Sequence, residues 1–207
     1  MIKLKTKALK PRIKARIRKG KIDLKKKFLA TRTKARIRKS KIGINTQVKN
    51  FFEWIKGAEI VELDHCNTKE DPVRPELNND FRTSYGRKIY GVKYKKEICA
   101  IMCFGYTNEI PKTVEELDLM TKDAHLQSTL RDQKVGKIAI AYTVWSKKKG
   151  GGKLIVKEVF KKIKKSNHLN RLVTLSPLTD MARNFHMRNG AIELQVNEKT
   201  QNFEYKI

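Results

Sequence analysis

From residue 45 onward, the spacing of apolar residues switches repeatedly between a helical and a strand period, which predicts a mixed α/β (α+β) fold. Four helices are predicted: one capped by Asn45 or Thr46 and ended by Gly57, one from Thr113 to about Leu130, and two over Gly151–Lys165 and Asp180–Asn189. Strands are predicted over Ala58–Leu63, Arg87–Tyr94, Ile98–Tyr106, Lys137–Trp145, Arg171–Leu175, Ala191–Val196 and Phe203–Ile207. Residues 64–84 are polar and contain two X-Pro pairs, so we expect a loop there.

Short sequence signals support the helix boundaries. The run Thr113-Val114-Glu115-Glu116 is a capping box, in which a threonine and a glutamate three residues later satisfy the free amides of a helix start. Gly190 is the expected left-handed stop of the helix that precedes it. The segment 151–165 is predicted to be amphipathic, with its lysines facing outward. Its expected inward residues are Leu154, Val156, Val159, Phe160 and Ile163.

Positive charge is concentrated at the N-terminus. The 207-residue chain has a formal net charge of +27, and residues 1–42 contribute 19 Lys and Arg against a single acid, Asp23. Within this segment, Lys14–Ile22 recurs as Lys34–Ile42 with one substitution in nine positions. We therefore predict a basic, repeat-containing flexible arm over residues 1–42 and a folded domain over residues 43–207.

The basic arm is expected to bind nucleic acid or another polyanion. A block of like charges repels itself when free and displaces counterions when it meets a polyanion. No base-reading motif is present, so binding is expected to be non-specific. A solvated tail, an anionic membrane surface and organelle targeting are the alternatives. The expected nucleic-acid contacts are Arg12, Lys14, Arg16, Arg18, Lys19, Arg32, Lys34, Arg36, Arg38 and Lys39.

Composition also argues against several classes of protein. No apolar run approaches the length of a membrane span, and no secretory leader is evident. The three cysteines, Cys66, Cys99 and Cys103, predict reduced thiols and a cytoplasmic location, which would be the host cytoplasm or a virion if the source is viral. Cys99 and Cys103 are expected on one face of a strand, as small buried residues. No His/Cys pairs stand at ligand spacing, so no metal site is predicted.

A basic, glycine-rich turn is predicted between a strand and a helix. The strand Ile138–Val144 is followed by Lys147-Lys148-Lys149-Gly150-Gly151-Gly152 and then by a helix. Glycines allow close backbone approach, and amides at a helix start converge on an anion. Alone, this turn is equally consistent with a flexible loop. The pattern Lys-x-x-Gly-x-Gly resembles the pyrophosphate loop of the N-acetyltransferase (GNAT) superfamily, with Lys147 where Gln or Arg is usual.

A second set of motifs lies downstream. Leu175-Ser176-Pro177 follows a predicted strand, and Phe185-His186 precedes Asn189-Gly190-Ala191. Together these resemble the C-terminal catalytic domain of malonyl-CoA decarboxylase, which has a GNAT fold. Thr107–Pro111 and Tyr142-Thr143-Val144 are similar to that family too, so the resemblance covers about residues 85–195.

The resemblance implies a GNAT-like acyl-CoA fold and a site for an acyl-CoA thioester. By position, Ser176 and His186 match the family's catalytic serine and histidine. Decarboxylation needs donors at a developing enolate and an acid for its carbon, which suits this pair. Tyr142 is expected in the core and Tyr205 at the edge of the site. The residues expected to bind acetyl-CoA or malonyl-CoA are Thr143, Val144, Trp145, Lys147, Lys149, Gly150, Gly151, Gly152, Lys153 and Asn189.

Two departures from the family leave three functions open. In the decarboxylases a large helical domain precedes the catalytic domain, whereas here the basic arm and about 40 residues of predicted loop and helix stand in that place. The family also has a long insertion between the serine and the histidine, whereas Ser176 and His186 are only ten residues apart. Decarboxylation of malonyl-CoA or a related acyl-CoA is one reading. The second is acyl transfer to nucleic acid or an associated protein, guided by the arm. The third is a degenerate, non-catalytic nucleic-acid-binding protein.

Overall fold

The computed structural model describes residues 46–132 and 134–206. The chain divides into two compact units that meet between Trp54 and Ile55, and each unit is described by itself. Residues 46–56 form a helix, as predicted. The predicted arm, residues 1–42, and all of its expected nucleic-acid contacts lie outside the described residues. None of the described helices is long and apolar enough to cross a membrane.

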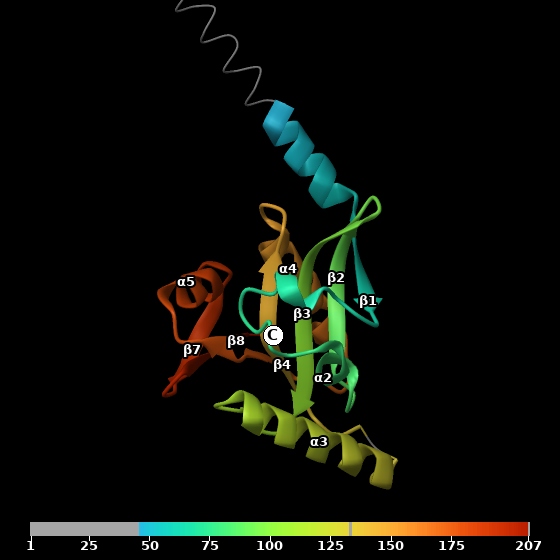
Figure 1. Cartoon of the computed structure of the whole chain (residues 1–207), viewed down its shortest axis with the longest axis vertical. Helices are drawn as coiled ribbons and strands as arrows, with labels where there is room; N and C mark the ends of the chain where they lie inside the picture. The colour runs from blue at the N-terminus through green and yellow to red at the C-terminus, as the bar shows by residue number, and fades with distance from the viewer. Residues whose placement is uncertain (1–45, 133, 207) are drawn as a thin grey trace, which may run out of the picture. The chain divides into compact units, whose positions relative to one another are not determined.

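The second unit is a mixed α/β structure (Figure 1). Its strands are β1 (Ala58–Leu63), β2 (Lys88–Tyr94), β3 (Glu97–Thr107), β4 (Ile138–Ser146), β5 (Arg171–Thr174), β6 (Ser176–Pro177), β7 (Ala191–Val196) and β8 (Thr200–Tyr205). Its helices are η1 (Thr68–Glu70), α2 (Asn79–Thr83), α3 (Val114–Arg131), α4 (Gly151–Lys164) and α5 (Asp180–Arg188). The fold class predicted from the sequence is confirmed.

The strands form one sheet in the order β1-β2-β3-β4-β5-β8-β6, and β7 pairs with β8. Neighbours are antiparallel except β4 and β5, which are parallel. The helix α4 connects these two strands and packs on β2, β3 and β4. A parallel pair requires such a crossover, because the chain must return to the end of the sheet where the first strand began before it enters the second strand.

The sheet opens at its parallel pair. The ladder between β4 and β5 stops at Ala141 and Thr174. Next to this point, β4 has a bulge: Phe104 pairs with Ala141 and Cys103 with Thr143, so Tyr142 has no partner on β3. A bulge bends a strand and increases its twist. Beyond it, β4 and the chain after β5 diverge, and the space between them becomes the cavity described below.

Several predictions of local structure were wrong in detail. The segment 64–84 is not a plain loop, because it holds η1 and α2, and Asn78 caps α2 by accepting a hydrogen bond from the Phe81 amide at 2.8 Å. The last strand begins at Thr200 rather than Phe203, and the short strand β6 was not predicted. On α4, Ile155 is fully buried, whereas Leu154 is only half-buried.

The predicted capping box is present with one change. The Thr113 hydroxyl accepts from the Glu116 amide at 3.2 Å, while the Glu116 carboxylate accepts from the amide of Lys112, not of Thr113, at 2.6 Å. Both amides lie outside the helical hydrogen-bond ladder, so each side chain satisfies a group that the helix itself leaves unpaired. The helix α3 then runs to Arg131, one residue beyond the predicted end.

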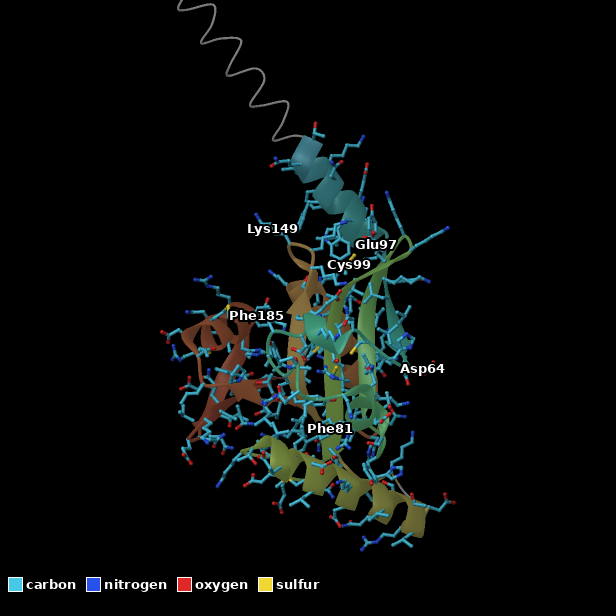
Figure 2. The ribbon with its side chains drawn as sticks, viewed as in Figure 1. Asp64, Phe81, Glu97, Cys99, Lys149 and Phe185 are labelled. Carbon is cyan, nitrogen blue, oxygen red and sulfur yellow. The ribbon has the colours of Figure 1, made fainter. Side chains whose placement is uncertain are left out.

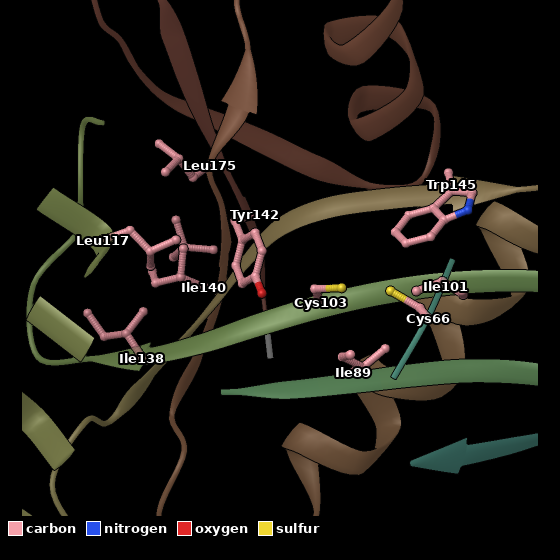
Figure 3. Packing of buried hydrophobic residues seen from close by; sticks show 11 residues of the cluster. Cys66, Ile89, Ile101, Cys103, Leu117, Ile138, Ile140, Tyr142, Trp145 and Leu175 are labelled. Atoms are coloured by element: carbon pink, nitrogen blue, oxygen red, sulfur yellow. The ribbon is translucent and has the colours of Figure 1, made fainter. Parts of the chain in front are cut away.

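One hydrophobic core cluster contains residues of β2, β3, β4 and β5 and Leu117 of α3, but no residue of α4. Figure 3 shows Ile89, Ile140 and Tyr142 in this cluster together with the thiols of Cys66 and Cys103, which point toward each other. A hydrogen bond to Cys103 lowers the pKa of the Cys66 thiol to about 7, and burial raises the pKa of Cys103. All three cysteines are buried and free; burial was predicted for Cys99 and Cys103.

The regular alternation from which Cys99 and Cys103 were predicted to share a face of β3 is interrupted at Cys99. Ala100 pairs with Val92, but Ile98 pairs with Lys93, so Cys99 lies in a bulge that interrupts the alternation of side chains. Cys99 does not belong to the core cluster that contains Cys103. A one-residue bulge cannot be read from sequence spacing, because spacing alone assumes a regular strand.

Candidate functional site

A cavity of about 880 Å³ occupies the opening between β4 and α5. Its volume lies at the upper end of the range for ligand pockets. One wall is β4 and the loop into α4; the opposite wall runs from Ser176 through α5 to Asn189. Figure 2 labels Lys149 on the first wall's loop and Phe185 on α5. Glu70, Pro72 and Val73, from the segment between β1 and α2, complete the lining.

The glycines of the loop have distinct structural roles. Gly150 caps α4 with a φ of 84°, a left-handed conformation that favours glycine. A Cβ on Gly151 would lie 2.3 Å from the Ser146 hydroxyl, and one on Gly152 would lie 3.2 Å from the Phe185 ring. These glycines therefore let α4 start against β4 and beside α5. The first amides of α4, which a helix leaves unpaired, stand at the cavity wall with Gly152 and Lys153.

The structure brings most of the predicted CoA-binding residues to one cavity. Those that line it are Thr143, Val144, Trp145, Lys147, Gly150, Gly152, Lys153 and Asn189. Lys149 and Gly151 do not line it; Gly151, the first residue of α4, is buried. The Lys147 ammonium lies 2.5 Å from the Glu70 carboxylate, so a phosphate would compete with Glu70 for this lysine.

Ser176 and His186 form a hydrogen-bonded pair on the opposite wall. The Ser176 hydroxyl lies 2.9 Å from His186 Nε2 and donates to the Thr174 hydroxyl at 3.1 Å. The other ring nitrogen, His186 Nδ1, lies 2.9 Å from the Tyr205 hydroxyl. The His186 ring also stacks on Phe203, with centroids 5.1 Å apart. The ten-residue spacing thus suffices to join serine and histidine, because β6 ends at Pro177 and α5 returns at once.

Burial keeps His186 and Tyr205 neutral in the free protein. It lowers the pKa of His186 to about 4 and raises the pKa of Tyr205, so at neutral pH the imidazole is uncharged and the phenol is protonated. If Tyr205 donates to Nδ1, then Nε2 carries the proton and donates to Ser176, which donates to Thr174. In the other tautomer Nδ1 donates to Tyr205 and Ser176 donates to Nε2, so the Thr174 hydroxyl then donates to Ser176. Tyr205 was expected only at the edge of the site. Its contact with His186 depends on the pairing of β7 with β8, which the sequence does not reveal.

A buried polar network, missed by the sequence analysis, supports β4 from the side of the segment 64–84. The Asp71 carboxylate accepts from the Thr143 hydroxyl at 2.9 Å and from the Arg82 guanidinium at 2.8 Å. Arg74 Nε donates to the Tyr142 carbonyl at 2.9 Å, and its Nη2 donates to the Leu175 carbonyl at 3.2 Å. Arg74 thereby bridges β4 and the residue after β5 just where the ladder between them ends.

The only advance signal for this network was the pair of charged residues each followed by proline, Asp71-Pro72 and Arg74-Pro75. Charged side chains in a polar stretch are normally solvated, so their burial could not be inferred. Burial lowers the pKa of Arg74 from its ordinary value. In the described residues, no group of three or more His, Cys, Asp or Glu is arranged to hold a metal ion.

Comparison with known proteins identifies the fold. The Bacillus subtilis acetyltransferase in complex with CoA matches with a TM-score of 0.50 at 10% identity, over 72% of this chain and 99% of that chain. A GNAT family acetyltransferase from Elizabethkingia anophelis with acetyl-CoA bound matches with a TM-score of 0.42 at 13% identity, over 73% of this chain and 99% of the other. The unit therefore has a GNAT-like fold, a conclusion that rests on the Bacillus subtilis structure.

The chain also matches part of malonyl-CoA decarboxylase from Agrobacterium vitis, with a TM-score of 0.47 at 15% identity. That match covers 63% of this chain but only 36% of the decarboxylase, so the chain spans about a third of the length of that protein. No protein-family model matches the sequence. No curated protein matches it either.

Proposed function

We propose that this protein is an acyl-CoA-dependent enzyme that decarboxylates malonyl-CoA or a related acyl-CoA through Ser176 and His186. The observation that carries the proposal is the buried Ser176–His186–Tyr205 chain of hydrogen bonds, of which Ser176 and His186 line the same cavity as the lysine-rich start of α4. Both members of the pair line the cavity, so a ligand bound there can reach them.

The cavity fits a CoA thioester at both ends. At one end, Lys147, Lys148 and Lys153 line the start of α4, where backbone amides and the helix dipole favour a pyrophosphate. At the other end, the wall around Ser176 and His186 contains Pro177 and Phe185, which suit a short acyl chain. The backbone of β4 runs between the two ends, in position to accompany an extended pantetheine arm.

The chemistry follows from the protonation of the site. Loss of CO2 from a malonyl thioester leaves the electron pair of the broken C–C bond on an enolate. The Ser176 hydroxyl supplies a hydrogen bond to the enolate oxygen, and His186 Nε2 delivers a proton to the carbon, directly or through Ser176. The substrate carboxylate opposes the burial that lowers the pKa of His186, so the bound substrate itself favours the protonated imidazole. After the transfer His186 is neutral again, as in the free protein, and it takes up a proton from solvent when the next substrate binds.

The test is release of CO2 and acetyl-CoA from malonyl-CoA by the purified full chain. Ser176→Ala and His186→Gln should each lower kcat by at least about 100-fold, because each removes a donor of the reacting groups, while CoA affinity changes little. His65→Gln alters an exposed histidine outside the cavity and is the matched control. Tight CoA binding without any turnover of malonyl-CoA would exclude decarboxylation.

Acyl transfer is a second candidate, favoured by the neutral state of His186. A neutral imidazole accepts a proton, as a base for an attacking amine must. Labelled acetyl-CoA incubated with RNA, DNA or a basic protein should then label the acceptor, and turnover should require that acceptor. A protein that neither binds CoA nor turns it over would instead be the non-catalytic form considered from the sequence.

A further inference from the structure

Lysines gather on the outer face of α4 and its flanking residues. Residues 147–165 contain nine lysines and one acid, Glu158, a net charge of +8. The remaining residues after position 42 contain 20 Lys and Arg against 19 acids, so they are almost neutral. The positive excess of the folded part therefore belongs to one loop and one helix. The site proposed above accounts for part of this excess, since Lys147, Lys148 and Lys153 line the cavity.

The other lysines of this face extend away from the cavity. Lys157, Lys161, Lys164 and Lys165 are exposed and do not line it. Lys153, Lys157, Lys161 and Lys165 follow one another at intervals of four residues, and Lys164 lies three residues after Lys161. All five therefore lie on one side of the helix, at steps of about 6 Å over roughly 18 Å. We call the four residues Lys157, Lys161, Lys164 and Lys165 the α4 lysine row.

This arrangement costs stability. Like charges four residues apart destabilise a helix, and Lys157–Lys161 and Lys161–Lys165 are such pairs. Within the described part of the chain, one ion pair involves the row, between Lys161 and Glu158 at 2.7 Å. An exposed face that serves only for solubility normally mixes both signs of charge. A regular row of one sign is what a linear polyanion would offset.

We propose that the α4 lysine row is a binding surface for the phosphodiester backbone of nucleic acid, without base selectivity. Its steps of about 6 Å are comparable with the spacing of successive phosphates along a strand, so several lysines can each meet a phosphate. A membrane surface fits less well. The apolar residues of α4, among them Ile155, Val159 and Ile163, are buried against the sheet, so the helix presents no apolar face that could insert into lipid.

This inference does not depend on the proposed catalytic function, and it concerns residues distinct from the predicted arm. The variant Lys157→Gln/Lys161→Gln/Lys164→Gln/Lys165→Gln removes the row in the full chain. The matched control neutralises four exposed lysines elsewhere and has the same net charge: Lys69→Gln, Lys96→Gln, Lys112→Gln and Lys199→Gln. Binding to a fluorescent duplex DNA and a single-stranded RNA is measured by anisotropy from 50 to 300 mM salt.

The row variant should bind at least about tenfold more weakly at 100 mM salt. The slope of log K against log salt should become shallower by up to about 3.6 for duplex DNA, since each of the four lost phosphate contacts removes about 0.9. The control should lose much less, and CoA affinity should be equal in both. Equal nucleic-acid binding by the two variants would overturn the proposal. So would a row variant that loses affinity for phosphatidylserine vesicles but keeps its affinity for both nucleic acids.

Discussion

At the scale of single residues, His186 shows how an environment sets the chemistry of a side chain. It contacts Ser176 through one ring nitrogen and Tyr205 through the other, while Phe203 stacks on its ring. None of these neighbours carries a charge that would stabilise an imidazolium, so burial alone decides its protonation. The site is thus ready to exchange a proton only when a ligand changes that environment.

The protonation of His186 predicts a pH dependence of stability. Its pKa is about 4 in the folded protein, against about 6.5 in an unfolded chain. As pH falls from 6.5 to 4, the unfolded state takes up the proton first, so the folded state should lose on the order of 3 kcal/mol over that range. Urea unfolding at a series of pH values measures this loss.

The variant His186→Gln should flatten that dependence between pH 6.5 and 4, because glutamine does not titrate. The control His65→Gln, altered at an exposed position, should keep the wild-type slope. A wild-type slope in His186→Gln would show that other groups produce the acid sensitivity.

At the scale of elements, the segment between β1 and β2 holds the open edge of the parallel pair. Arg82, on α2, is wholly buried and donates to the Asp71 carboxylate, to the carbonyls of Arg74 and Leu77, and to Cys103 Sγ at 3.3 Å. Asp71 in turn holds Thr143 on β4. The segment is therefore a structural brace for the strand that forms one wall of the cavity.

Removing one partner from this network should lower the free energy of unfolding. Arg82→Met leaves the Asp71 carboxylate buried without its cation, and we expect a loss of about 3–5 kcal/mol in the free energy of unfolding. Lys88→Met is the control, since Lys88 and Glu62 are both 44% exposed, and an exposed pair contributes about 0–1 kcal/mol. Urea denaturation compares the two. Similar small losses would mean that solvent reaches Asp71 and that the brace is weak.

At the scale of the whole molecule, positive charge stands in two places: residues 1–42 and the segment 147–165. The first lies outside the described residues, and the second forms the loop and helix beside the cavity. If both bind the same nucleic acid, their contributions to the salt dependence of binding should add, because the slope depends on the total number of phosphates that the protein neutralises.

The arm's contribution can be measured in the full chain. Replacing six arginines of the arm by glutamine should reduce the salt slope for duplex DNA by up to about 5, since each phosphate contact adds about 0.9. These arginines are Arg12, Arg16, Arg18, Arg32, Arg36 and Arg38. CoA affinity should stay unchanged. An unchanged slope would indicate that the arm is a solvated tail, the alternative considered from its composition.

Much of this protein was determined locally and could be read from its sequence. Helix and strand periods, the capping box at Thr113 and the glycine stop at Gly190 act over a few residues, so the fold class and most elements were predictable. The pairing of Ser176 with His186 was suggested by resemblance, and their hydrogen bond is compatible with it.

Only the tertiary structure decided the rest. Tyr205 reaches His186 through strand pairing, and Asp71 meets Arg82 and Thr143 across segments as much as 72 residues apart. The bulge at Cys99 depends on the register of β2 against β3. Such contacts leave no periodic trace, because burying a charge or shifting a register is favourable only when the partner from elsewhere in the chain is already in place.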